Sequence, residues 1–153
     1  MKKTFLNSHA YWEKAWQEAR RTSLFRRNED KGTLIDFWNS RANDFRNNTI
    51  GKKGQKRVDK IFAWLEQQGV VLEGAKILDI GAGPGSFALP MVVRGAAQVV
   101  ALEPADTMVE FLNELVKEAG YTNIQVIQKM WEEIEVDSLG LVGQFDLVFP
   151  SGQ

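Results

Sequence analysis

The sequence predicts an α/β fold with a doubly wound, mostly parallel sheet of about four strands and an N-terminal helical layer. From residue 76 onward, short apolar segments alternate with amphipathic helical segments, an order that is typical of parallel sheets. The clearest strand, over residues 99–102, contains only apolar residues, as expected where helices cover both faces of a sheet. Residues 1–70 contain only helical patterns. We therefore expect a helical segment over residues 1–70 and an α/β domain over residues 71–153.

The helices before the sheet are predicted from the spacing of their apolar residues. They cover residues 8–27, 33–47 and 55–68, with a loop over residues 47–54. Their apolar faces consist of Trp12, Trp16, Ala19, Leu34, Trp38, Phe45, Val58, Ile61, Phe62 and Leu65. The second helix opens with Thr33 and Asp36 in capping-box spacing, and the third ends at Gly69, a residue favoured just after a helix.

The α/β part is expected to contain four strands and two helices between them. The strands cover residues 77–80, 99–102, 124–127 and 145–149, and the helices cover residues 87–94 and 106–119. The apolar face of the second helix consists of Met108, Val109, Leu112, Leu115 and Val116. Gly95 and Gly120 end the two helices, and the first is expected in spite of Pro90.

The composition excludes several classes of protein. The chain has no cysteine among its 153 residues, which excludes disulfides, thiolate metal sites and a cysteine nucleophile. No cluster of metal ligands is apparent, so no metal is expected. No apolar run approaches the roughly 18–20 residues that cross a bilayer. No signal-peptide core follows the basic N-terminus, and a cytoplasmic protein without a membrane partner is expected.

The charges are unevenly distributed along the chain. Residues 1–60 contain 15 Lys and Arg against 7 Asp and Glu, whereas residues 61–153 contain 4 against 13. A basic arm of this kind can bind nucleic acid or another anion. The simpler interpretation is a solvated basic helical layer beside an acidic domain, and we favour it.

A glycine-rich turn follows the first expected strand and precedes a helix. It contains Gly81, Gly83 and Gly85 at alternate positions, and glycine allows both a sharp turn and a close approach of backbone to ligand. The free N–H groups of the following helix point at whatever lies in such a turn. The turn therefore suits a dinucleotide or another nucleotide-like ligand. The dinucleotide fingerprint requires Gly or Ala at the place of Ser86, which counts against a nicotinamide cofactor.

An acidic residue ends the second expected strand. Glu103 follows Gly81 by 22 residues, a spacing at which a carboxylate accepts hydrogen bonds from the hydroxyls of an adenosine ribose. The alternative is a strand-end residue that only caps the turn with Pro104. The strand, the glycine turn and the acidic residue together favour an adenosyl ligand.

The two motifs resemble those of a known family. Residues 77–88 resemble motif I, and residues 100–105 the second motif, of class I S-adenosylmethionine (SAM)-dependent methyltransferases, over about residues 76–150. The resemblance implies a Rossmann-like fold, SAM as cofactor and S-adenosylhomocysteine as product. It implies that residues 71–153 bind SAM and that residues 1–70 lie on the substrate side. Motif I is specific to the superfamily, not to one substrate.

The resemblance also implies roles for individual residues. The turn of Gly81, Ala82, Gly83 and Gly85 would line the methionine moiety of SAM, whose amino group Asp79 would bind directly or through water. Glu103 would hold the ribose hydroxyls, with Pro104 beside the adenine.

Two further strand ends are assigned by the same comparison. Many relatives place an Asp after the third strand to meet the adenine amino group, but this chain has Met130 and Trp131 in that region. We expect these two side chains to cover the adenine, although an aromatic residue there also serves packing. The resemblance places Phe149, at the end of the fourth strand, beside the reacting methyl. The residues after it do not form the Asn/Asp-Pro-Pro-Tyr/Phe pattern of amino-methylating nucleic-acid enzymes.

The acceptor and the catalytic residues are not identified by the sequence. The absence of the Asn/Asp-Pro-Pro-Tyr/Phe pattern favours a small-molecule acceptor. A less favoured acceptor is RNA, which would bind through the basic residues of segment 52–57. Two competing hypotheses are a SAM-binding module without activity of its own and a nicotinamide dehydrogenase. His9, the sole histidine, is expected to have no catalytic role.

The family sheet has seven strands in the order 3-2-1-4-5-7-6, and this sequence supplies four. The fourth strand would then form an exposed apolar edge, which folded proteins normally cover. We expect either a fragment of a longer enzyme or a homodimer in which a partner copy covers this edge.

Overall fold

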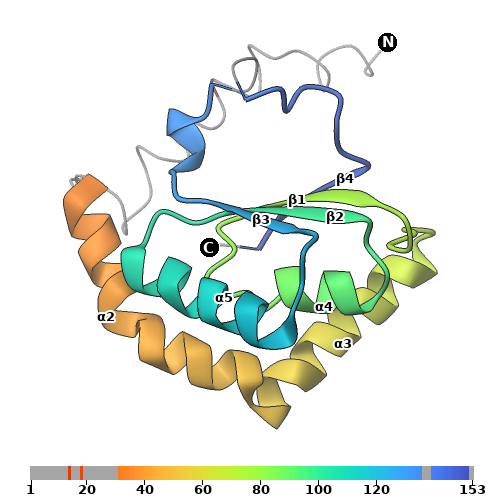
Figure 1. The fold of residues 1–153 in the computed structure, drawn as a ribbon, viewed down its shortest axis with the longest axis horizontal. Coiled ribbons are helices and arrows are strands. Elements are labelled where there is room, and N and C mark those ends of the chain that lie inside the picture. The colour runs from red at the N-terminus through yellow and green to blue at the C-terminus, as the bar shows by residue number, and fades with distance from the viewer. Residues whose placement is uncertain (1–13, 15–17, 19–30, 136–138, 152–153) are drawn as a thin grey trace. The chain divides into compact units, whose positions relative to one another are not determined.

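The computed structural model describes residues 14, 18, 31–135 and 139–151 (Figure 1). The elements in chain order are α2 (Lys31–Ile50), α3 (Lys52–Gln67), β1 (Lys76–Ile80), α4 (Ala88–Val93), β2 (Gln98–Leu102), α5 (Asp106–Ala119), β3 (Ile124–Ile127), the 3-10 helix η1 (Trp131–Glu133) and β4 (Leu147–Pro150). The chain divides into two compact units, residues 1–34 and 35–153. The helix expected over residues 8–27, with His9, lies outside the described residues except for helical Lys14 and Glu18.

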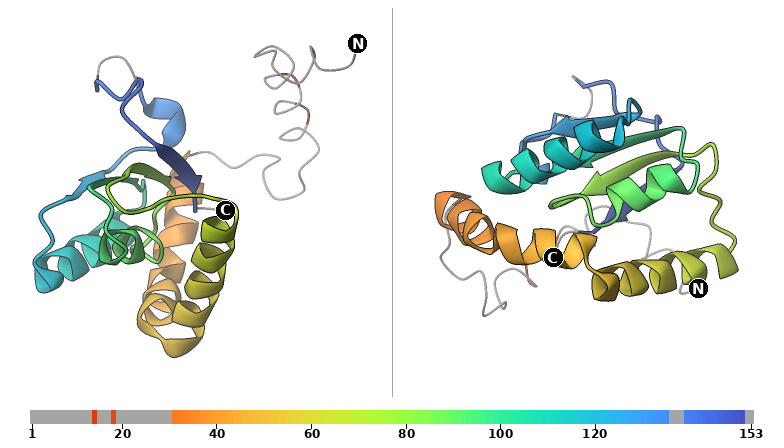
Figure 2. Two further views of the ribbon diagram at one scale, coloured as in Figure 1. Left: turned by 90° about the vertical axis from the view of Figure 1, so that its right-hand side faces the viewer. Right: turned by 60° about the horizontal axis from the view of Figure 1, so that its bottom comes forward.

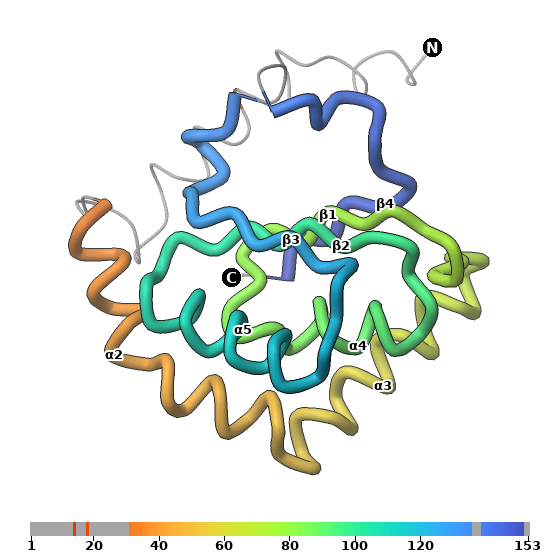
Figure 3. Tube along the Cα trace, viewed as in Figure 1, coloured from red at the N-terminus to blue at the C-terminus, as the bar shows by residue number. Residues whose placement is uncertain are grey.

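The four strands form one parallel sheet in the order β3-β2-β1-β4. The chain therefore moves outward from β1 through β2 to β3 and then returns to pair β4 with the other side of β1, as the trace in Figure 3 shows. The expected parallel α/β fold is confirmed. Ligands of such sheets bind at the carboxyl ends of the strands where the order reverses, which here is the boundary between β1 and β4.

The sheet is covered differently on its two faces (Figures 1 and 2). Helices α3, α4 and α5 lie on one face, and the connection from β3 to β4, which carries η1, lies on the other. The core on the helical face includes Val58, Phe62, Ile77, Ala88, Met91, Val99 and Leu112. The core on the other face consists of Leu78, Val100 and Leu102, against which Ile134 and Phe145 of the connection pack. Complete burial of one such side chain stabilises the fold by roughly 1.5–3 kcal/mol.

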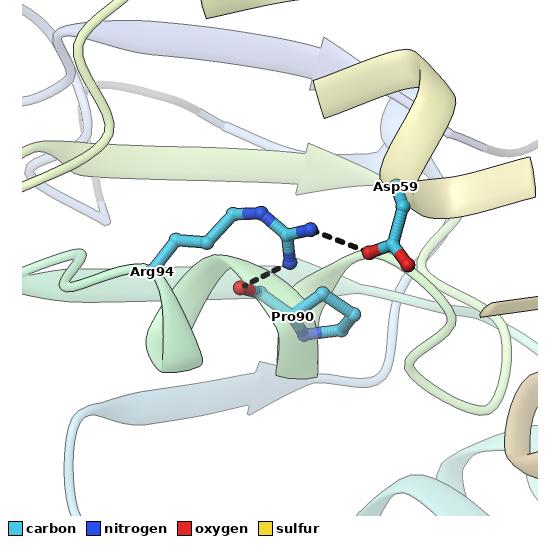
Figure 4. Close-up of polar contacts among 3 residues, drawn as sticks. All are labelled: Asp59, Pro90 and Arg94. Carbon is cyan, nitrogen blue, oxygen red and sulfur yellow. Dashed lines mark hydrogen bonds and ion pairs between the residues drawn. The ribbon is translucent and has the colours of Figure 1, made fainter. Parts of the chain in front are cut away.

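An ion pair, drawn in Figure 4, and a cation–π contact join α3 to the end of α4. Arg94 donates to Asp59 Oδ1 at 2.7 Å and to the carbonyl oxygen of Pro90 at 3.4 Å. Its guanidinium also lies 4.4 Å from the ring centroid of the buried Phe62. Pro90 lies in the first turn of α4, where its missing N–H has no helical acceptor. This explains why the helix forms in spite of the proline.

Several predicted boundaries are wrong. The predicted loop over residues 47–54 is helical except at Gly51, which is extended and separates α2 from α3. As a result, α3 begins at Lys52 and not at residue 55. At the other end, α2 begins at Lys31, so Thr33 lies inside this helix instead of opening it. The fourth strand begins at Leu147 and not at residue 145. The bounds of α5 and β3 agree with the prediction.

The inward faces of α3 and α5 agree with the predicted ones, since Val58, Phe62, Met108, Val109 and Leu112 are buried. By packing, α3 belongs with the sheet, because Val58 and Phe62 lie in the main core. The functional division expected at residue 70 stays a prediction. None of the described helices is long and apolar enough to cross a membrane.

In the described chain β4 pairs only with β1. Val148 at this edge is 51% exposed. The expectation that a partner copy covers the edge stays a prediction.

Candidate functional site

The predicted site residues meet at the carboxyl ends of β1, β2 and β4. Side chains alternate between the faces of a strand, so Asp79 lies on the same face as Ile77, toward the helices. Asp79 is in register with Ala101 of β2 and with Phe149 of β4. The carboxylate of Asp79 thus lies at the point where the strand order reverses, directly before the glycine-rich turn.

The turn is fixed to the end of β2 by its own backbone. The N–H groups of Gly81 and Ala82 both donate to the carbonyl oxygen of Leu102 at 2.9 Å, and Ala82 is buried. Gly83 and Gly85 have positive φ angles of 56° and 97°, which favour glycine. A Cβ on Gly85 would lie 2.7 Å from Leu112 Cδ1, whereas a Cβ on Gly83 would meet nothing within 4 Å. Gly85 therefore permits close packing, and Gly83 borders open space in which a ligand can lie.

Glu103 links the turn to the start of α5. Its Oε2 accepts a hydrogen bond from the N–H of Gly83 at 2.8 Å, and its Oε1 accepts one from the N–H of Ala105 at 2.9 Å. Burial raises the pKa of Glu103, while these two N–H groups lower it. A carboxylate has about four acceptor positions, so each oxygen retains one for a ligand. This arrangement suits two neighbouring hydroxyl groups.

Asp79 is the second buried carboxyl group of the site and is 0% exposed. The hydroxyl of Ser151 contacts its Oδ1 and lies 3.2 Å from the carbonyl oxygen of Gly81. Asp79 Oδ2 is buried and has no hydrogen-bond partner among the described residues. Burial raises the pKa of Asp79 to about 7, and the charge of Glu103 adds a smaller upward effect that hydrogen bonds from Ser151 oppose. An unpartnered buried oxygen of this kind suits a cationic or hydrogen-donating ligand group.

Helix α2 borders the same site through two contacts that the sequence did not predict. The hydroxyls of Thr49 and Ser86 lie 2.5 Å apart, which joins the end of α2 to the glycine-rich turn. Asn39 Oδ1 accepts a hydrogen bond from the N–H of Thr107 at 3.0 Å and so caps α5 from another helix. The capping preference of Asn was a usable signal, but no pattern in the sequence indicated which helix it would cap.

The remaining predicted residues are placed less closely. Pro104 is half-buried between Glu103 and α5. Phe149 is also half-buried, and its ring centroid lies 5.0 Å from that of Phe87, so it packs in the core beside the turn. Met130 is half-buried and Trp131 is 45% exposed. In the described structure no hydrogen bond or ring contact joins either of these two to the turn or to Glu103, and their contact with adenine stays a prediction.

The end of β3 is connected to the site through a different residue. Gln128 donates to Asp106 Oδ1 at the first residue of α5. A groove of about 400 Å³ lies along α2, lined by Arg41, Asp44, Phe45, Asn47 and Asn48. None of the cofactor-binding residues predicted from the sequence is among these lining residues. We therefore locate the ligand site by the two carboxyl groups and the open side of Gly83.

The geometry fits an adenosyl amino acid. Glu103 offers two acceptors for a ribose diol, the turn offers open space at Gly83, and Asp79 offers an unpartnered oxygen for an amino group. In the described part of the site, Asp79 and Glu103 are the ionisable groups that could take part in acid–base catalysis.

Comparison with known proteins agrees with this geometry. Residues 77–153, half of the chain, match the methyltransferase domain family. The chain is 35% identical over 92 residues to ribosomal RNA small subunit methyltransferase G of Mycobacterium ulcerans, covering 56% of this chain and 54% of that protein. It is 23% identical over 121 residues to EEF1A lysine methyltransferase 2 of Danio rerio, covering 79% of this chain and 43% of that protein. The chain thus spans about half the length of these curated relatives.

Solved structures show the same fold. Magnesium protoporphyrin IX methyltransferase from Synechocystis PCC 6803, in complex with SAM, is 25% identical, with a TM-score of 0.60 over 79% of this chain and 61% of that one. SAM is the cofactor of this fold family, and the family match over residues 77–153 includes the glycine-rich turn, Glu103 and β4. On its sequence, its strand order and the geometry of its strand ends, the chain belongs to the methyltransferase domain family, in its class I, SAM-dependent group.

Proposed function

We propose that this chain binds SAM at the carboxyl ends of β1 and β2 and positions it for methyl transfer to a small-molecule acceptor. The observation that carries the proposal is the carboxylate of Glu103, which is held by the N–H groups of Gly83 and Ala105 and retains an acceptor on each oxygen. In this proposal Glu103 binds both ribose hydroxyls. The turn from Gly81 to Gly85 lines the methionine moiety, and Asp79 binds its amino group.

The residues of the site act by positioning. SAM supplies an electrophilic methyl group on a sulfonium, and transfer is an in-line displacement that requires the acceptor within about 3–3.5 Å of the methyl carbon. Glu103 and the glycine-rich turn fix one end of the cofactor, and Asp79 fixes the other. Phe149 and Phe87 form the apolar wall of the turn. Positioning of the acceptor is the main requirement of such a displacement, and we assign no general base.

The acceptor proposal rests on the end of β4. Phe149, Pro150 and Ser151 replace the Asn/Asp-Pro-Pro-Tyr/Phe pattern of amino-methylating enzymes, which supports a small molecule. Because the chain spans about half of its curated relatives, the competing proposal is a SAM-binding part that requires further sequence for turnover. Methyl transfer to a panel of acceptors, measured for this chain and for longer versions, distinguishes the two.

The cofactor site is tested by titration calorimetry with S-adenosylhomocysteine. We expect saturable binding that Glu103→Ala weakens, since each hydrogen bond to a charged acceptor contributes roughly 1.5–3 kcal/mol. Glu110→Ala, on the exposed side of α5, is the matched control and should leave affinity unchanged. Unchanged affinity in Glu103→Ala on folded protein would contradict the ribose assignment. Heat with NAD but none with S-adenosylhomocysteine would support a dehydrogenase instead.

A second candidate acceptor is RNA, and the outer side of α3 favours it. This side carries the exposed residues Lys52, Lys53, Lys56, Arg57, Lys60 and Trp64. By helical periodicity the five basic residues fall within an arc of about 140°, opposite the buried Val58 and Phe62. None of them forms an ion pair within the described part of the chain. A row of basic residues beside an exposed aromatic side chain suits a single-stranded nucleic acid, because the basic residues neutralise its phosphates and its bases can stack on the aromatic ring.

The relatives add limited support to the RNA candidate, since one of them is named a ribosomal RNA methyltransferase. Filter binding of single-stranded RNA over a salt series tests it. Replacing Lys53, Arg57 and Lys60 with Gln should lower the salt slope by about 2, at roughly 0.7 per phosphate contact. Lys117→Gln, exposed on α5, is the control. An unchanged slope in the triple variant would contradict the RNA proposal.

A further inference from the structure

The hydroxyl of Ser151 lies between two acceptors. One is Asp79 Oδ1, which it contacts closely, and the other is the carbonyl oxygen of Gly81 at 3.2 Å. A serine hydroxyl carries a single hydrogen, so it donates to only one of them at a time. Which acceptor receives the hydrogen depends on the protonation of Asp79.

Two complete hydrogen-bond arrangements are compatible with these positions. When Asp79 carries a proton on Oδ1, it donates to Ser151 Oγ, and the Ser151 hydroxyl donates to Gly81. When Asp79 is ionised, the Ser151 hydroxyl turns and donates to Oδ1. Asp79 Oδ2 has no partner in either arrangement, but only the second arrangement also buries a negative charge. Burial of an unpaired charge is costly, so the free protein favours the first arrangement below the pKa of Asp79, which is about 7.

We propose that Asp79, Ser151 and the carbonyl of Gly81 form a proton-linked receptor for a primary ammonium group, in which binding of the ammonium at Asp79 Oδ2 displaces the Asp79 proton and turns the Ser151 hydroxyl from Gly81 to Asp79. Ser151 is a positioning residue in this scheme. The proton passes to solvent, and no covalent bond of the ligand changes. The inference rests on the proposed cofactor site, since the α-amino group of SAM is the ammonium in question.

The charged surroundings of Asp79 agree with this scheme. Glu103, at the end of β2, is the charged group that acts on it, and its negative charge favours the protonated form. Strand β4, helix α4 and the glycine-rich turn contain no ionisable side chain. An arriving ammonium would therefore be the cation that compensates two neighbouring carboxylates. Burial raises the pKa of Asp79 to about 7, which places the change within reach of ordinary buffers.

The experiment is calorimetric titration with S-adenosylhomocysteine at pH 6, 7 and 8, each in buffers with different ionisation enthalpies. The slope of the observed heat against the buffer enthalpy gives the protons released per ligand. We expect close to one proton at pH 6, about half at pH 7 and little at pH 8, with affinity about tenfold weaker at pH 6 than at pH 8. 5′-Methylthioadenosine, which lacks the amino-acid portion, should release no proton at any of these pH values.

Three variants isolate the role of Ser151. Ser151→Ala removes a hydrogen bond that stabilises the carboxylate, so proton release should extend to higher pH and S-adenosylhomocysteine should bind more weakly at pH 7. Ser151→Thr retains a hydroxyl and should restore the normal profile. Ser40→Ala, whose hydroxyl bonds only the Phe37 carbonyl oxygen within α2, is the matched control. 5′-Methylthioadenosine should bind all of them equally.

The outcomes separate the two proposals. Absence of saturable heat with S-adenosylhomocysteine on folded protein overturns the proposed function and, with it, this inference. Normal binding without proton release at pH 6, or with the same release for 5′-methylthioadenosine, overturns the inference alone. A pH profile of Ser151→Ala identical to that of the unaltered chain also overturns it.

Discussion

Gly83 and Gly85 differ in what a side chain would meet. At Gly85 a new Cβ would lie 2.7 Å from Leu112 Cδ1 and 3.0 Å from Leu89 Cγ, at a φ of 97°. Both neighbours belong to packed helices, so they cannot move freely. At Gly83 the same atom would enter open space at a φ of 56°. Gly85 is therefore required for packing, and Gly83 leaves room beside Glu103.

This difference predicts opposite phenotypes for two Gly→Ala variants. Gly85→Ala should lower the free energy of unfolding by roughly 2–5 kcal/mol, from left-handed backbone strain and overpacking. Gly83→Ala should cost only about 1–2 kcal/mol of backbone strain but should weaken S-adenosylhomocysteine binding, because its methyl group enters the ligand space. Urea unfolding and calorimetry measure the two effects. If both variants were equally destabilised and Gly83→Ala still bound S-adenosylhomocysteine normally, the placement of the ligand beside Gly83 would be contradicted.

At the residue scale, the sequence predicted those groups whose role depends on local spacing. Asp79 and Glu103 end neighbouring parallel strands, so their convergence follows from strand order alone. Ser151 and Asn39 were not predicted, because their contacts join residues 72 and 68 positions apart. The rotation of one helix and the length of one strand decide such contacts, and neither leaves a local pattern.

Among the elements, α2 has the closest connection to the site. Its Trp38 and Ala42 pack against Ala105 and Met108, which come two and five residues after Glu103 in the chain. The prediction of a loop over residues 47–54 is wrong because Asn and Lys, which are common in loops, here occupy exposed positions on two helices that Gly51 separates. The polar residues of this segment indicate only that it is exposed to solvent, and Gly51 alone indicates where α2 ends and α3 begins.

The cap that Asn39 supplies to α5 is testable by itself. Asn39→Ala leaves the N–H of Thr107 without its side-chain acceptor, and the loss of such a cap costs about 1 kcal/mol. Because α5 begins just after Glu103, we also expect weaker binding of S-adenosylhomocysteine. Asn43→Ala, exposed on the same helix, is the control for helix propensity. Equal stability and affinity of the two variants would show that α2 does not support the site.

For the whole molecule, strand order and layering followed from the alternation of apolar and amphipathic segments. The covering of the two faces of the sheet was not predicted correctly. Helices were expected on both faces, but the described residues of the β3–β4 connection contain only the short 3-10 helix η1. Ile134 and Phe145 cover that face with few apolar side chains. The charge pattern placed acidic residues in the α/β part, but burial of two of them depends on tertiary packing.

Those two buried carboxyl groups give the whole fold a pH dependence of stability. Burial raises the pKa of Asp79 from 3.8 to about 7 and also raises that of Glu103. Between about pH 4 and pH 7 the folded chain therefore binds more protons at Asp79 than the unfolded chain, so its contribution to the free energy of unfolding falls as pH rises. The slope is at most about 1.4 kcal/mol per pH unit, and the contribution is fully present below pH 4 and lost above pH 7.

Asp79→Asn mimics the protonated carboxyl group, since its amide can donate to Ser151 without a charge. We expect this variant to be more stable than the unaltered chain at pH 8, with a difference that narrows toward pH 4, in urea unfolding followed by circular dichroism. Asp36→Asn, exposed on α2, should leave the profile unchanged. A constant difference between Asp79→Asn and the unaltered chain across this range would mean that Asp79 does not exchange its proton on folding, and the buried carboxyl group would then be ionised throughout.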